Sequence, residues 1–252
     1  LKIYDFPILY FPKFFHPDPS VKRQSGLLKP QINNSNILGS SLTLPYFKVI
    51  SDSKDLTVTP ILFDNSTSML TTEYRAVNKN SKILADFGYV NDYKSTTTNK
   101  KNSLSHLFFN LDHNLNLENY NSSNLELSLK KVSKDTYLKI FDQQVTESTL
   151  RPDNFDKLDS SLKIFLNHAD FNLTTGIQSY EDLQIKTRSD RYQYNLPYYN
   201  FDKLISQNFF DGNINFDSSG NNYLTDTNKL ETSIINNFNY NSLDYVSNLG
   251  IK

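Results

Sequence analysis

Side chains that could carry out catalysis or bind a metal are few and scattered in this chain of 252 residues. The four histidines, His16, His106, His113 and His168, do not have the spacing of metal ligands. His106 and His113 lie seven residues apart, which would put them on opposite faces of a strand. The simpler interpretation is that these histidines lie on a surface or line a lumen.

Sequence motifs and composition also argue against an enzyme. No Gly-x-Ser-x-Gly, phosphate-binding glycine loop or His-Glu-x-x-His occurs. The acidic pair Glu181-Asp182 is expected to be solvated in a polar turn. The chain has no cysteine, which excludes disulfides, thiolate metal sites and a cysteine nucleophile. Its 26 basic and 27 acidic residues are spread along the chain. We therefore predict no covalent chemistry, no cofactor, no metal and no nucleic-acid partner.

The dominant pattern is alternation of apolar and polar residues with period two. Leu125, Leu127 and Leu129, for example, alternate with Glu126 and Ser128. Most of the segments are about nine to eleven residues long, which is the length that a tilted strand needs to cross a bilayer core. No apolar run is long enough for a transmembrane helix. The expected strands are 39–50, 54–63, 68–78, 82–92, 104–114, 123–132, 160–168, 171–187, 209–217, 230–240 and 243–252.

Three irregular regions interrupt this pattern. Residues 93–103 form a polar tract, and in residues 133–159 we expect one helical turn at 137–141 before Pro152. A third irregular region surrounds residues 194–199. Short turns at one end of a sheet and longer polar loops at the other are typical of an outer-membrane barrel. A soluble sandwich with long loops would show a similar pattern.

The first residues differ from the rest of the chain. Residues 1–15 are apolar and aromatic, with strands broken by Pro7 and Pro12, and residues 16–36 are expected to be a loop. The chain begins and ends within expected strands, so we expect it to be an internal part of a longer protein.

Several landmarks, in this order, resemble the LptD family of outer-membrane lipopolysaccharide-assembly proteins. They are Phe11-Pro12, His16-Pro17-Asp18-Pro19, the stretch from Val21 to Pro30, Gly39, Leu44-Pro45-Tyr46-Phe47, the stretch from Asp55 to Pro60, Glu73-Tyr74-Arg75, the stretch from Ser133 to Leu138, and Leu196-Pro197-Tyr198-Tyr199. The resemblance implies an all-β fold, in which the end of a periplasmic jelly-roll and a linker (1–36) precede the N-terminal part of a large antiparallel transmembrane β-barrel (37–252). It also implies a location in the outer membrane, with the N-terminal part in the periplasm. The cysteines that link the two domains in some family members are missing here.

The resemblance places the barrel seam at the first strands, where Pro45 and Pro60 lie. Proline has no N–H group for a sheet ladder, so two prolines in adjacent strands would weaken pairing there. The implied function is a lateral gate, through which lipopolysaccharide passes from the lumen to the outer leaflet. Ordinary bulges that bend the strands are the alternative interpretation.

The apolar start would then supply a lipid path through Ile8, Tyr10, Phe11, Phe14 and Phe15. Packing in the jelly-roll core or at the domain junction is the alternative, and it is the commoner role of such residues. Three basic residues near the junction are candidates for contacts with lipid phosphates, although a charged hinge loop would look the same. They are Lys22, Arg23 and Lys29.

The resemblance implies three partners: lipopolysaccharide, the lipoprotein plug LptE in the barrel lumen, and the periplasmic bridge protein LptA. Two other functions fit the same sequence pattern. A general porin or transport barrel would share the alternation, and a soluble β-sandwich binding module would bury its alternating face internally.

Overall fold

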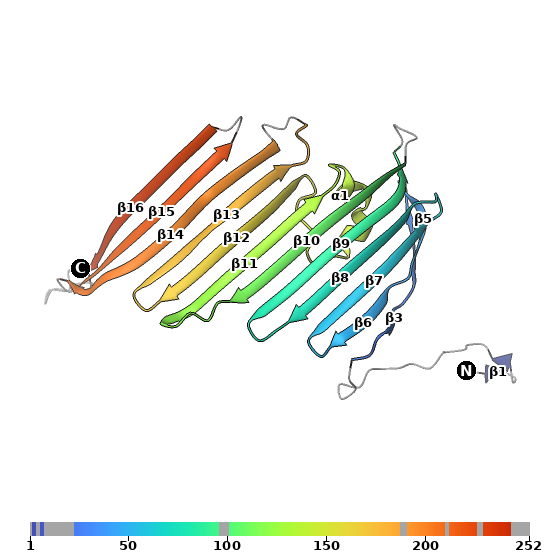
Figure 1. Cartoon of the computed structure of the whole chain (residues 1–252), viewed down its shortest axis with the longest axis horizontal. Coiled ribbons are helices and arrows are strands. Elements are labelled where there is room, and N and C mark those ends of the chain that lie inside the picture. The colour runs from blue at the N-terminus through green and yellow to red at the C-terminus, as the bar shows by residue number, and fades with distance from the viewer. Residues whose placement is uncertain are drawn as a thin grey trace.

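Antiparallel strands make up most of the chain in the computed structural model, which describes residues 2–3, 6–7, 23–95, 101–186, 191–209, 212–225 and 229–242. Fourteen strands form one sheet, and β1 pairs with β2 in a separate sheet (Figure 1). The strands are β1 (Lys2–Ile3), β2 (Phe6–Pro7), β3 (Gly26–Leu27), β4 (Gln31–Ser35), β5 (Gly39–Thr43), β6 (Tyr46–Ser51), β7 (Lys54–Phe63), β8 (Ser68–Val77), β9 (Ser81–Lys94), β10 (Lys101–Asn114), β11 (Tyr120–Val132), β12 (Lys157–His168), β13 (Phe171–Asp182), β14 (Tyr192–Phe209), β15 (Gly212–Thr225) and β16 (Lys229–Ser242). The helices are α1 (Tyr137–Ile140) and α2 (Asp142–Thr146).

The strands follow one another as a meander, so the predicted all-β antiparallel fold is confirmed. From β7 to β16 every strand pairs with its neighbour in sequence. β3 and β4 form one interrupted strand, residues 26–35, which we call the first strand. β5 and β6 form the second strand, residues 39–51, which pairs with β7 along both of its parts. The predicted helical turn is confirmed by α1.

Three expectations about local structure are wrong. The expected strand 209–217 crosses a strand boundary, because Phe209 ends β14 and Gly212 begins β15. Residues 26–27 and 31–35 were expected to lie in a loop, but they pair with the second strand and form one edge of the sheet. Residues 194–199 were expected to be irregular, but they lie inside β14. Gly176 of β13 pairs with Tyr198, whereas Gln178 pairs with Asn195. This register shift leaves Leu196 and Pro197 as extra residues within β14. The expected strand 243–252 lies outside the described residues.

The register gives the sheet one apolar and one polar face. Directly paired residues share a face, so the pairings align one apolar row across five strands: Ile83, Leu111, Leu127, Leu162 and Ile177. One residue along, the row on the opposite face is Leu84, Asn110, Ser128, Ser161 and Gln178. We call these the apolar face and the polar face.

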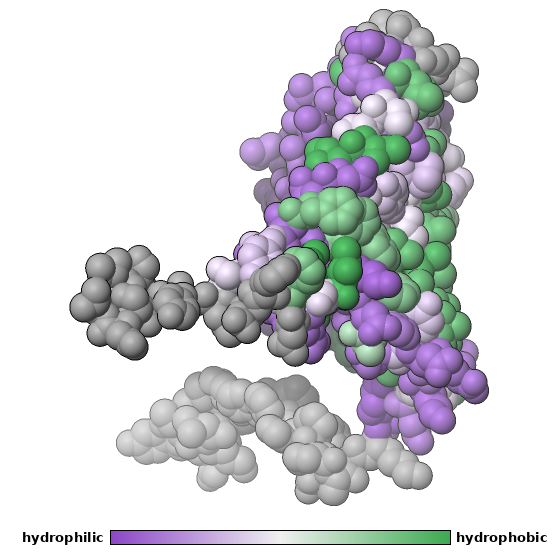
Figure 2. Space-filling model, turned by 90° about the vertical axis from the view of Figure 1, so that its left-hand side faces the viewer, coloured by the Kyte–Doolittle hydropathy of each residue, from purple (hydrophilic) through white to green (hydrophobic). Residues whose placement is uncertain are grey.

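The apolar face is uncovered in the described part of the chain. Large apolar side chains on it, such as Leu62, Phe87 and Leu107, remain exposed. Figure 2 looks toward the β16 edge and shows hydrophobic side chains along one side of the sheet, with hydrophilic side chains at both ends and on the other side. A sandwich would cover such a face with a second sheet. The described 14-stranded sheet thus has one exposed apolar face.

The two ends of the sheet carry different connections. At one end, which we call the turn end, the strands are joined by the short segments 52–53, 78–80, 115–119 and 169–170. At the other, which we call the loop end, lie the long connection 133–156 and the connection between β13 and β14 (Figure 1). The predicted division into short turns and longer loops holds for these two connections, whereas 36–38 and 64–67, also at the loop end, are as short as the segments at the turn end. Neither helix among the described residues is long and apolar enough to cross a membrane.

The helical loop, residues 133–156, folds back over the polar face and forms the core there. Tyr137, Leu138, Phe141 and Val145 are at most 1% exposed. They pack in one cluster with side chains from β9 and β10, including Phe108. The loop therefore covers the loop-end part of the polar face, where it packs against apolar side chains from β7 to β12.

A charge on the apolar face should be tolerated far less well than a charge on the polar face. The sequence predicts that this sheet crosses a membrane, where a charge on the apolar face would have to sit in hydrocarbon. On that prediction we expect Leu127→Lys to lower the free energy of unfolding of the full-length protein in lipid by about 2–4 kcal/mol. Urea titration, followed by heat-modifiable gel migration, measures this loss. Ser128→Lys is the matched control on the polar face, and equal losses for the two variants would contradict the assignment of the faces.

Candidate functional site

Three prolines lie at one level across the edge of the sheet. Pro30 lies between β3 and β4, Pro45 lies between β5 and β6, and Pro60 lies within β7. The backbone N–H of Leu28 donates to the carbonyl of Pro45 at 2.8 Å, and the N–H of Leu44 donates to the carbonyl of Pro60 at 3.1 Å. The sequence prediction placed Pro45 and Pro60 in the first two strands of the sheet, but they belong to the second and third.

Each of the two outermost ladders loses a hydrogen bond at these prolines. In a strand, the N–H and C=O groups of one residue point toward the same neighbour. The carbonyl of Pro45 accepts from the first strand, so the N–H group that Pro45 lacks would also have pointed to the first strand. By the same argument, Pro60 removes a bond between β7 and the second strand. The edge is therefore held by fewer bonds than the centre.

A bulge adds to this irregularity. Gln31 pairs with Thr43 and Leu27 pairs with Tyr46, so three residues of the first strand face two residues of the second. An extra residue leaves part of the ladder unpaired and increases the local twist. The outer strands are thus least tightly joined at the position of the three prolines.

An ion-pair cluster at the turn end joins the start of the first strand to β7 and β8. The side chain of Asp55 is only 6% exposed, and its carboxylate pairs with the guanidinium groups of Arg23 and Arg75. The Arg75 Nε–Asp55 Oδ1 distance is 2.7 Å. Arg23 also lies over the ring of Phe47, 5.4 Å from its centroid. Arg23 is therefore engaged by the sheet itself, and its predicted role toward a lipid phosphate stays a prediction.

The remaining predicted site residues are placed only in part. Lys29 is exposed on the first strand, next to Pro30. The other members of the predicted lipid path and phosphate set lie outside the described residues. They are Ile8, Tyr10, Phe11, Phe14, Phe15 and Lys22.

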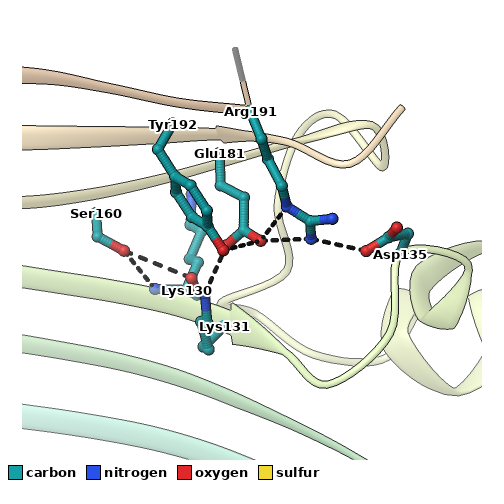
Figure 3. A network of polar contacts seen from close by, with 7 residues as sticks. All are labelled: Lys130, Lys131, Asp135, Ser160, Glu181, Arg191 and Tyr192. Carbon is teal, nitrogen blue, oxygen red and sulfur yellow. Dashed lines mark hydrogen bonds and ion pairs between the residues drawn. The ribbon is translucent and has the colours of Figure 1, made fainter. Parts of the chain in front are cut away.

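A second ion-pair cluster, shown in Figure 3, fixes the helical loop at the loop end. Arg191 donates from Nε to Glu181 at 2.9 Å and from a terminal nitrogen to Asp135 at 2.7 Å. Lys131 donates to the other oxygen of Glu181 at 2.7 Å, and the Tyr192 hydroxyl donates to Oε1 at 3.1 Å. The hydrogen bonds to Asp135 and Glu181 raise the pKa of the Arg191 guanidinium further above its usual range. The expectation of a solvated Glu181 is wrong, because the register of β13 turns its carboxylate toward three donors.

A buried histidine, His106, lies beneath the helical loop. The expectation that it lies on a surface or lines a lumen is wrong, because its side chain is covered by Tyr137. His106 shares a hydrogen bond of 2.8 Å between Nδ1 and the hydroxyl of Tyr137, and its Nε2 lies 3.3 Å from Asp86. Burial raises the pKa of the Tyr137 hydroxyl well above its usual range, so the hydroxyl stays protonated. Gly88 is directly paired with His106, and a Cβ there would lie 2.3 Å from the ring. This glycine was the one local signal for the site.

The ion pairs and the buried histidine described above stabilise the fold. Among the described residues, no cluster of three or more His, Asp or Glu side chains could hold a metal ion. The paired carboxylates are occupied by cations of the same chain. The described residues form a sheet with one apolar face, one polar face and a weakened edge. The helical loop covers part of the polar face.

Curated relatives named LPS-assembly protein LptD match this region. The relative from Cupriavidus necator is 29% identical over 186 residues, which is 73% of this chain and 21% of the relative. The relative from Idiomarina loihiensis is 29% identical over 140 residues, or 56% of this chain and 18% of the relative. The relative from Acinetobacter baylyi is 33% identical over 129 residues, or 50% of this chain and 15% of the relative. This chain is LptD-like.

The similarity has a limited extent along LptD. The chain spans about a fifth of the length of the Cupriavidus and Idiomarina relatives. No protein-family model matches the chain. The resemblance to LptD predicted from the sequence landmarks is therefore confirmed for this region, and the activity of a whole LptD protein is a separate question.

Removing the central cation of the loop-end cluster should loosen the helical loop. We expect Arg191→Ala to destabilise the docked loop by about 1–2 kcal/mol, because Asp135 loses its partner and Glu181 keeps only Lys131 and Tyr192. Limited proteolysis within residues 133–156 of the full-length protein measures the change. Arg151→Ala is the control, since the Arg151 side chain is exposed and, among the described residues, bonds only to the Thr146 carbonyl. Equal cleavage rates in the two variants would contradict the anchoring role.

Proposed function

We propose that this chain forms the opening part of a large outer-membrane barrel in a protein that inserts lipopolysaccharide into the outer leaflet. The similarity to LptD over 186 residues carries this proposal. The two-faced sheet supports it, because a barrel wall needs an apolar surface toward lipid and a polar surface toward the lumen. The uncovered apolar face favours this function over a soluble sandwich module.

Closure of the barrel is part of the proposal. The first strand and β16 are the two edges of the described sheet. Bare N–H and C=O groups find no partner in hydrocarbon, so further strands must join these edges in the membrane. We propose that the first strand meets the closing strand at the seam of the barrel.

The lateral gate is proposed to lie at this seam, with Pro45 and Pro60 weakening its near side. Their positions support the gate, since both remove bonds from the ladders nearest the edge. A seam with few bonds can part sideways and let an amphipathic lipid leave the lumen. No covalent step is needed, and the energy for transport has to come from another component.

The N-terminal residues are proposed to connect this barrel to a periplasmic jelly-roll. Ile8, Tyr10, Phe11, Phe14 and Phe15 would continue a lipid path. The basic residues Lys22, Arg23 and Lys29 would meet lipid phosphates at the junction. Because the described sheet starts at residue 26, we propose that the linker ends before that residue rather than at residue 36.

The proposed partners are lipopolysaccharide, LptE and LptA. LptE would lie in the lumen, against the polar face, and LptA would dock on the jelly-roll. Residues 133–156 already cover part of the polar face at the loop end. A lumenal plug would therefore meet the remaining polar face, toward the turn end and toward β12–β16.

Complementation tests the function directly. The full-length protein would be expressed in a bacterium whose own lptD gene is repressed, and lipopolysaccharide at the cell surface would be quantified. We expect growth and surface lipopolysaccharide to be restored. A protein that shows heat-modifiable migration but restores neither, and that conducts small solutes, would favour a general porin.

Restoring the missing N–H groups should slow export. We expect the double substitution Pro45→Val and Pro60→Val in the full-length protein to reduce surface lipopolysaccharide several-fold, because two net hydrogen bonds of about 1 kcal/mol each would tighten the outer ladders. Thr59→Val is the matched control, since it introduces a valine in the same strand without adding an N–H group. Unchanged export in a correctly folded double variant would rule out the gate role of these prolines.

A further inference from the structure

We propose that the first strand, residues 26–35, is a strap held at both ends and free to bow in the middle, and that Arg23 and Gln143 are the positioning residues that hold it. The inference rests on the proposed seam and concerns how that seam is regulated. It rests on contacts at the turn end, at the loop end and behind the middle of the strand.

At the turn end the strap is fixed by charge. Arg23 lies three residues before β3, and its guanidinium reaches the nearly buried carboxylate of Asp55. Arg75 on β8 holds the other oxygen of Asp55, so the contact reaches across β7 to β8. The N–H of Val49 also donates to the Ser25 hydroxyl at 2.8 Å. A carboxylate this deeply buried stays paired because an unpaired charge there would be costly.

At the loop end the strap is fixed by the helical loop. Nε2 of Gln143 on α2 donates to the backbone carbonyl of Asn34 at 3.3 Å, across 109 residues of sequence. The loop itself is firmly docked, through the buried Tyr137 and Phe141 and through the pair between Asp135 and Arg191. A movement of Asn34 away from the sheet must therefore break a contact with an anchored element.

The Asn34 carbonyl points away from the second strand, toward the open side of the sheet edge. Ser40 and Leu44 of the second strand bond toward β7, through Asp64 and Pro60 respectively. Alternate residues of a strand point to opposite neighbours, so Ser41 and Thr43 point to the first strand and Asn34, opposite Ser40, points away from it. Gln143 thus holds a carbonyl on the open side of the edge, where the second strand supplies no bond.

Between these two fixed ends, the strap is loosely held. Among the described residues, residues 28–30 make one backbone hydrogen bond to the second strand, from Leu28 to Pro45. Behind them lies a cavity of about 600 Å³, between the outer strands and α2, with Gln31, Pro45 and Gln144 in its lining. The middle of the strap therefore has both few bonds and room to move.

The consequence is a particular mode of opening. A strand that is free at one end peels progressively, whereas a strap fixed at both ends parts first in the middle and keeps its register. Because Gln143 belongs to the helical loop, any change that undocks this loop also releases the loop-end fastening. The strap thus links the loop end of the protein to the seam.

Amide hydrogen exchange in the full-length protein tests the two fastenings separately. We expect Gln143→Ala to speed exchange in residues 31–35 about two- to tenfold, the effect of losing one hydrogen bond, without changing residues 26–28. Arg23→Ala should do the reverse. Gln144→Ala and Lys29→Ala are the controls, since Gln144 lies next to Gln143, Lys29 lies in the strap itself, and neither side chain forms a hydrogen bond among the described residues.

Conservative variants separate positioning from general destabilisation. Gln143→Lys keeps a donor and should restore slow exchange, whereas Gln143→Glu has the same shape without a donor and should behave like the alanine variant. Exchange in β10 and β11 should stay unchanged throughout. If one single substitution releases all of residues 26–35, or if neither changes exchange, the strap is wrong. This readout does not need lipopolysaccharide, so a failure of the export function would appear only in the complementation experiment.

Discussion

Strand register is the constraint on which the rest of this structure depends. Each ladder keeps one set of residues on the apolar face and the alternate set on the polar face, so that Ile83, Leu111 and Leu127 share one face while Leu84, Asn110 and Ser128 share the other. A slip of one residue in any ladder would turn apolar side chains to the polar face. The central strands β9 and β10 have 14 residues each and hold this register over long ladders. The apolar face, the docking surface for the helical loop and both ion-pair clusters follow from this register.

The edge of the sheet departs from this regularity in a limited way. β4 and β5 have only five residues each, and prolines separate them from β3 and β6. Shortened and interrupted strands are a common device for blunting a sheet edge. In this protein the prolines lie at the same position along three adjacent strands. Contacts with the rest of the chain hold the edge at the turn end and at the loop end. The edge is therefore weak at a defined place rather than frayed along its length.

Two buried carboxylates play matching roles at opposite ends of the sheet. Asp55 at the turn end is shared by Arg23 and Arg75, and Glu181 at the loop end is shared by Lys131 and Arg191. In each case one cation comes from a strand and the other from a segment beside the sheet. A carboxylate removed from water needs such partners, so each cluster fastens a neighbouring segment, the strap at one end and the helical loop at the other. The apolar contacts of Tyr137 and Phe141 then seal the loop against the polar face.

The sequence by itself determined the fold class, most of the strands from 39 to 240, the helical turn near 137 and the resemblance to LptD. These follow from local properties, namely the period-two alternation and the order of short motifs, which need no knowledge of distant partners. Only the tertiary structure decided that residues 26–35 form the edge strand, because their polar sequence, interrupted by Pro30, pairs only when a regular second strand is present. It also decided the partners of Asp55, Glu181, His106 and Asn34. Each of these partners is set by the register of strands far apart in the chain, as in the contact between Gln143 and Asn34 across 109 residues, and composition and spacing carry no record of that register.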